Sequence, residues 1–166
     1  MLNRMIGAAR LDVRVYEEVE ADTTATPQAM TVVLLVALAS GIGALATGGL
    51  GGLISGVIFG LVSWAFWAYI TYVIGTTLFR TPETEADWGQ LARTTGFAQT
   101  PGVLRVFGLI PGIGLTIYFA ASLWQLVAMV IAVRQALDYR STWRALGVVA
   151  VGFIVLIIVQ AIIFRL

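Results

Sequence analysis

Residues 51–60 read GGLISGVIFG, in which Gly52, Gly56 and Gly60 lie four residues apart, and Gly48 continues the series one step earlier. In water, a glycine inside a helix costs about 0.5–1 kcal/mol relative to alanine. A series of four glycines in an otherwise apolar stretch therefore needs a compensating contact. A lipid bilayer allows one, because small residues let the backbone of a second helix approach closely. The stretch predicts a transmembrane helix with glycines along one face.

The composition of the whole chain also indicates a membrane protein. Of its 166 residues, 59% are hydrophobic and 11% are charged, and the mean hydropathy is +0.92. A soluble domain carries about 25% charged residues, so the charge is too low for a surface that faces water throughout. All acidic residues lie in 1–29, 79–105 and 134–144, and long apolar runs separate these segments. We expect an all-α integral membrane protein, because helices satisfy their own backbone in lipid.

The apolar runs predict a bundle of about five transmembrane helices, since about 20 residues cross a bilayer. The expected spans are about 30–46, 52–78, 94–111, 113–136 and 143–164, which form one transmembrane domain at 30–166. The third span is expected to kink at Pro101. A re-entrant hairpin is the alternative for this segment.

The arginines predict the orientation of the bundle. With five crossings and a cytosolic N-terminus, most of them lie on the inner side of the membrane, as the positive-inside rule requires. These are Arg4, Arg10, Arg14, Arg80, Arg93, Arg134, Arg140 and Arg144. Arg105 lies within the third span and Arg165 lies outside. We expect a multi-pass protein of the cell inner (cytoplasmic) membrane, with its C-terminus outside and no cleavable signal peptide.

Residues 1–29 are expected to form a cytosolic or interfacial segment with two halves. In the first half, the apolar residues recur at helical spacing, which predicts a short amphipathic helix on the inner leaflet. The second half is acidic and is expected to face water or another protein through Tyr16, Glu17, Glu18, Glu20 and Asp22. Adjacent carboxylates without a glycine-turned loop are weak support for a divalent cation, so no metal site is predicted.

The missing residue types exclude several kinds of chemistry. The chain has no cysteine, histidine or lysine. Disulfides, thiolate metal sites, a Ser/His/Asp triad and a Schiff-base lysine are therefore excluded. The net charge of +1 does not suggest nucleic acid as a partner. We expect a protein that is not an enzyme and holds no cofactor.

The glycine series is the first candidate site. On a helix of 3.6 residues per turn, Gly48, Gly52, Gly56 and Gly60 drift by only about 40° per step, so they form a continuous groove. The groove indicates either an interface with another copy or a partner, or helix packing inside the bundle.

Arg105, together with Gln125, is the second candidate. An arginine at the centre of a span costs about 2.5–3.5 kcal/mol on insertion scales, and the expected spans contain no acid to pair with it. The functional interpretations are a site for an anion or a lipid headgroup, or a polar pathway. The alternatives are snorkelling to the inner interface, or pairing with carbonyls freed at Pro101. For Gln125 the alternative is an interhelical hydrogen bond.

Three stretches give the chain a resemblance to a known family: ARLDVRVYEEVEAD (9–22), GFAQTPGVLRVFGLIPGIG (96–114) and LWQLVAMVIAVRQALDYRSTWRAL (123–146). Together with the apolar segments, they resemble the Yip family of five-span membrane proteins (Ypt/Rab-interacting proteins, the "Yip-one" domain), in particular its prokaryotic branch. The resemblance implies a cytosolic N-terminal region and a compact bundle of spans. It implies neither an assigned reaction nor a cofactor.

Two functions are consistent with these patterns. The first is a scaffold, membrane-organising protein or accessory subunit that lies in the lipid bilayer and binds other membrane proteins or itself. The second is a small channel or transporter that uses Arg105 and the Pro/Gly-broken third span. The absence of acids within the spans and of an internal repeat favours the first.

Overall fold

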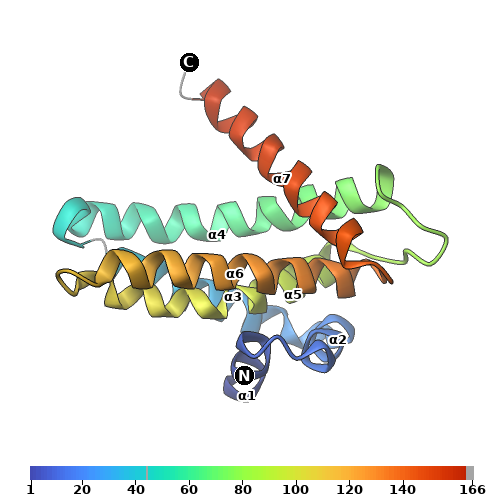
Figure 1. The fold of residues 1–166 in the computed structure, drawn as a ribbon, viewed down its shortest axis with the longest axis horizontal. Helices are drawn as coiled ribbons and strands as arrows, with labels where there is room; N and C mark the ends of the chain where they lie inside the picture. Colours follow the sequence, from blue (N-terminus) through green and yellow to red (C-terminus); the bar gives the residue numbers. More distant parts are fainter. Residues whose placement is uncertain (44, 164–166) are drawn as a thin grey trace.

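The computed structural model describes the backbone of residues 1–43 and 45–163, and the side chains of these residues except 45–48, 50, 52, 160 and 163. In this part of the chain all regular structure is helical (Figure 1). The elements are α1 (Leu2–Ala9), α2 (Val13–Ala21), the 3-10 helix η1 (Thr23–Ala25), α3 (Thr26–Gly43), α4 (Leu45–Thr77), α5 (Trp88–Ala98), the 3-10 helix η2 (Thr100–Leu109), α6 (Gly114–Ala136) and α7 (Thr142–Ile163).

Four of the expected spans are present as helices long and apolar enough to cross a membrane. In the described residues, these lie at Thr23–Gly43, Leu53–Thr77, Gly114–Ala136 and Thr142–Val159. The expected break between the first two spans is also present, because Gly49 has a left-handed φ of 58° and interrupts α4. Glycine adopts this conformation without a steric penalty.

The third expected segment, 94–111, differs from a continuous kinked span. It begins inside α5, which starts at Trp88, and it changes to the 3-10 helix η2 at Thr100. Pro101 lies at the start of η2. Its ring removes a backbone donor and clashes with the preceding turn of an α-helix, so α5 ends before it. The expected kink at Pro101 therefore becomes a boundary between two kinds of helix.

The pair α5–η2 nevertheless carries the chain along the bundle beside α3. Gly96 of α5 lies against Ala29 near the start of α3, Gly102 against Val36, and Gly108 against Gly43 at the end of α3. α6 then begins at the end where α3 stops and finishes where α4 finishes, since Leu137 contacts Gly75. Helices α4 and α6 therefore run in the same direction (Figure 1).

Tryptophans of α4 connect it to α5 and α6. The Trp64 indole donates a hydrogen bond to the Ala92 carbonyl at 3.1 Å, and the Trp67 indole donates to the Met129 sulfur at 3.2 Å. Both rings are buried. These contacts satisfy the polar edge of each indole while its apolar surface fills the space between helices.

The N-terminal segment forms two helices where one short helix was expected. α1 and α2 are joined by Leu11, whose φ is 63°, and they pack against α5 and α6. Tyr16 was expected to face a partner, but its side chain is fully buried and its hydroxyl donates to the Ala8 carbonyl at 2.9 Å. The aromatic ring lies in the apolar contact between α2 and its neighbours, so Tyr16 does not belong to the exposed acidic surface.

Gly43→Ala is expected to lower the stability of the fold by about 1–3 kcal/mol, because overpacked cores lose free energy of this order. A methyl group at Gly43 would collide with the carbonyl oxygen of Arg105, which is backbone and cannot rotate away. Gly56→Ala is the matched control, since nothing lies within 4 Å of the Cβ it would add. Thermal unfolding in mild detergent compares the two variants. A Gly43→Ala protein as stable as the wild type would contradict the close approach of η2 to α3.

Candidate functional site

A cavity of about 330 Å³ lies between α3, α4, η2 and α6. Apolar and small side chains form most of its wall. Among the described residues that line it, Arg105 is the one charged side chain, and none carries a carboxylate. The lining residues are Val33, Val36, Ala37, Ser40, Gly41, Gly56, Gly60, Gln99, Arg105 and Tyr118.

The guanidinium of Arg105 is held by neutral groups. Its Nη2 donates a hydrogen bond to the Ser122 hydroxyl at 3.1 Å, and its Cζ lies 5.2 Å from the centroid of the Tyr118 ring. Arg105 Nε and Gln125 Oε1 are buried without a hydrogen-bond partner in the described part of the chain. Buried polar atoms of this kind are uncommon, and each calls for a structural explanation.

Arg105 points toward the interior of the bundle. Its carbonyl contacts Gly43 at the end of α3, whereas its guanidinium reaches Ser122, eight residues after the first residue of α6. At 1.5 Å per residue this is about 12 Å along α6. One sequence-based alternative therefore finds no support, because the hydrogen bond described for the guanidinium goes to Ser122 instead of a carbonyl freed at Pro101.

The structure brings part of the glycine series to the same cavity. Gly60 lies close to Ala37, with 3.1 Å between the Ala37 Cβ and the position of an added Cβ, so it packs inside the bundle. Gly56 has open space above it and lines the cavity. The surroundings of Gly48 and Gly52 lie outside the described residues. Gly56 and Gly60 therefore line the same cavity as Arg105, although the two candidate sites are far apart in the sequence. Gln125 lies beside this cavity, with its Oε1 near Gly102.

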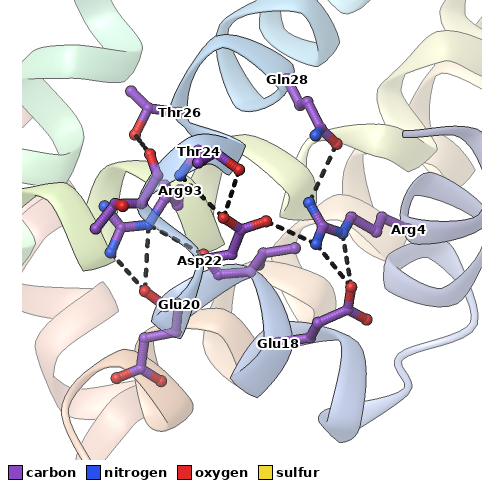
Figure 2. A network of polar contacts seen from close by, with 10 residues as sticks. Arg4, Glu18, Glu20, Asp22, Thr24, Thr26, Gln28 and Arg93 are labelled. Atoms are coloured by element: carbon purple, nitrogen blue, oxygen red, sulfur yellow. Dashed lines mark hydrogen bonds and ion pairs between the residues drawn. The ribbon is translucent and has the colours of Figure 1, made fainter.

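A second polar region holds the N-terminal helices to the bundle (Figure 2). Arg93 of α5 is 5% exposed and donates to the backbone carbonyls of Val19 and Glu20 at the end of α2. These carbonyls lack partners within their own helix, so the arginine caps α2 from another element. No sequence signal identifies this role, because Arg93 follows α2 by about 70 residues and pairs with backbone instead of an acid.

Arg4 of α1 completes this region. It forms ion pairs with Glu18 and Asp22, each at 2.7 Å, and donates to the Gln28 amide oxygen at 3.3 Å. Of the acidic residues expected to face a partner, Glu18 and Asp22 are therefore engaged within the chain. Glu17 accepts a hydrogen bond from Gln135 at 3.0 Å, although its side chain is still exposed.

Glu20 faces a polar cavity of about 270 Å³ between α2 and the end of α6. Burial, together with the neighbouring Asp138, raises the pKa of Glu20 to about 7, although Arg93 acts in the opposite direction. The other charged groups around it are Glu17, Asp87, Arg134 and Arg140. In the described residues, no group of three or more acidic, histidine or cysteine side chains is arranged to hold a metal ion.

The docking of α2 is expected to weaken as the pH rises from 5 to 8. The folded pKa of Glu20, about 7, exceeds the ordinary value of 4.5 for a glutamate. Its contribution to stability is therefore complete below about pH 4.5 and is lost as the pH rises through 7. Hydrogen exchange of residues 13–21, corrected for the intrinsic effect of pH, should increase several-fold over this range. Glu20→Gln should abolish the increase and Glu83→Gln should keep it. If hydrogen exchange of residues 13–21 increased with pH to the same extent in Glu20→Gln, Glu20 would not be the group that controls the docking of α2.

These features define a class: a polytopic helical membrane protein whose described charged side chains, except Arg105, lie at one end of the bundle or in the N-terminal helices. The chain belongs to the family defined by the Yip1 domain, whose model matches residues 13–163. This confirms the resemblance to the Yip family. Comparisons with curated proteins and with solved structures gave no match.

Proposed function

We propose that this Yip1-domain protein is a non-enzymatic scaffold that binds other membrane proteins through helix packing. The observation that carries the proposal is the course of α7, which diverges from the bundle along its second half (Figure 1). Its first half packs on the chain, with Gly147 against Phe79 and Gly152 against Trp67. In its second half, Ile154, Ile157 and Ile158 are more than half exposed.

The diverging half of α7 is in a better position to pack against a helix of another protein than against the other helices of this bundle. Lipid tails are as apolar as isoleucine, so exposure alone does not drive association, and van der Waals packing does. The Trp67–Phe153 ring contact, with centroids 4.8 Å apart, holds α7 near its middle. The half of α7 beyond this contact presents an extended apolar surface to a second membrane protein. The side chain of Glu17, which is exposed on α2, adds a polar surface on the N-terminal helices.

The proposed orientation places α1 and α2 in the cytosol and has the chain cross the membrane five times. Support comes from the parallel direction of α4 and α6, since the chain must return across the bundle between them and α5–η2 lies on that path. Arg93, Arg134 and Arg144 lie at the same end as α2, in agreement with the positive-inside rule.

A reporter fused after Leu166 is expected to lie outside the cytosol, and one inserted after Gly112 is expected to lie on the same side. A reporter fused before Met1 should be cytosolic. Paired phosphatase and fluorescent-protein fusions measure the side of each position. A cytosolic reporter after Leu166 would mean four crossings and would contradict the proposed topology.

A photoreactive residue in place of Ile157 is expected to cross-link to another membrane protein in the native membrane. The same residue in place of Leu123, which is 65% exposed on α6, is the matched control. The partner should co-purify at fixed stoichiometry in mild detergent, and its yield should fall several-fold in Ile157→Ala but not in Leu123→Ala. A second copy of this chain as the captured partner would identify a homo-oligomer. A lone monomer without cross-links from either position would refute the scaffold.

The alternative function is a small channel or transporter, and the cavity around Arg105 is the observation that favours it. Under this hypothesis, protein in liposomes would support an ion or solute flux that Arg105→Ala abolishes. The absence of flux in both proteins would count against a channel and leave the scaffold unaffected.

A further inference from the structure

Arg105 holds a positive charge in a cavity that supplies no negative one. No acidic residue occurs between Asp22 and Glu83 or between Asp87 and Asp138, and the cavity lies within these stretches. Ser122 and Tyr118 are neutral. An arginine inside a membrane protein normally pairs with an opposite charge or faces water, because its charge is costly in lipid. The guanidinium therefore has no negatively charged partner among the described residues, although an arginine inside a membrane protein normally has one.

The chemistry of the missing partner follows from the donor. A guanidinium carries five N–H donors in a planar fork that matches the oxygens of carboxylates and phosphates. Only one of its hydrogen bonds is described, that to Ser122, and Nε is buried without a partner. An oxyanion beside Arg105 would accept charge-assisted hydrogen bonds from the donors that remain.

The rest of the cavity suits an apolar chain. Val33, Val36 and Ala37 form the wall on α3, and Gly56 and Gly60 form it on α4. Gly56 is exposed, so the cavity opens past α4 toward the surrounding lipid. Its volume of about 330 Å³ lies at the small end of the range for ligand pockets, about 300–1,000 Å³. Ser40 and Gln99 add two neutral polar side chains to the lining. A charged group in a cavity with a mostly apolar wall is the feature of a site for an amphiphile.

We propose that this cavity binds the oxyanion of an anionic amphiphile, a phosphate or carboxylate carried on an apolar chain, with Arg105 as its partner. The glycines of α4 give the chain room beside α3. The Ser122 hydroxyl, which also donates to the Tyr118 carbonyl at 2.8 Å, positions the guanidinium toward the cavity. This proposal does not depend on the scaffold role, since it concerns a lipid ligand within the bundle and not a protein partner on α7.

Two variants test the two halves of the site. Arg105→Gln removes the charge and keeps a polar side chain. Gly56→Leu places a larger side chain at the wall of the cavity and keeps Arg105, and the open space at its Cβ lets the helix form normally. Arg80→Gln is the control, because it removes the same charge from an exposed position.

Both site variants should fold, since losing an arginine favours insertion and leucine is a better helix former than glycine. The unfolding temperature of each variant without ligand checks that it folds. If Arg105→Gln does not fold, the binding measurement on Gly56→Leu is enough to test the proposal.

The measurement is binding to the full chain in dodecyl maltoside, by native mass spectrometry and by the shift in unfolding temperature. The probes are phosphatidylglycerol, oleate, phosphatidylcholine and inorganic phosphate. Phosphatidylglycerol or oleate should bind and raise the unfolding temperature of the wild type and Arg80→Gln. The affinity should fall by about tenfold or more in Arg105→Gln, as expected for a lost charge-assisted contact. It should fall by a similar factor in Gly56→Leu, because the leucine takes up room that the apolar chain needs.

The four probes distinguish the sources of the oxyanion. Stabilisation by an anionic lipid but not by inorganic phosphate supports an amphiphile. Stabilisation by inorganic phosphate that Arg105→Gln abolishes supports the oxyanion site but assigns it to a free anion. Equal binding of phosphatidylcholine and phosphatidylglycerol, or unchanged affinity in both site variants, would overturn the proposal.

Discussion

The close approach of the backbones of α3 and η2 is the constraint on which the rest of the structure depends. Gly43 and Gly108 lie against one another, and Gly102 lies against Val36, so there is no room for larger side chains along this contact. Burial from water does not draw helices together in lipid, whereas close packing does. With η2 held against α3, the chain enters α6 at the correct end, and a cavity forms where the glycines of α4 face Arg105.

The 3-10 conformation of η2 follows from the same environment. Pro101 cannot continue α5, and an open loop at this depth would leave backbone groups unsatisfied in lipid. A 3-10 helix keeps a repeating set of hydrogen bonds, for example from the Gly102 amide to the Gln99 carbonyl at 2.8 Å. It also rises about 2.0 Å per residue, compared with 1.5 Å in an α-helix. Ten residues of η2 therefore carry the chain farther along α3 than an α-helix of equal length would.

The two polar regions of the molecule have opposite characters. At the α2 end, Arg4 and Arg93 are matched by carboxylates and by helix-end carbonyls, so their charges serve to hold α1 and α2 in place. In the cavity, the groups described around Arg105 are neutral. Arg4 and Arg93 therefore have structural roles, whereas Arg105 keeps hydrogen-bond donors without a described partner. For this reason Arg105, and not Arg4 or Arg93, is the proposed partner of the anionic amphiphile. The second half of α7 diverges from the bundle (Figure 1), and the proposed scaffold role rests on this half.

The sequence by itself determined the membrane location, the four apolar spans, the break near Gly49 and the family, because hydropathy and glycine act locally. It also predicted an interruption at Pro101, but as a kink and not as the boundary between α5 and η2. Tertiary structure alone decided that Tyr16 is buried, that Arg93 caps α2, and that Arg105 shares a cavity with Gly56 and Gly60. Each of these depends on residues from different helices meeting in space. Periodicity along one helix cannot reveal such a meeting, since it depends on how closely each backbone approaches the next.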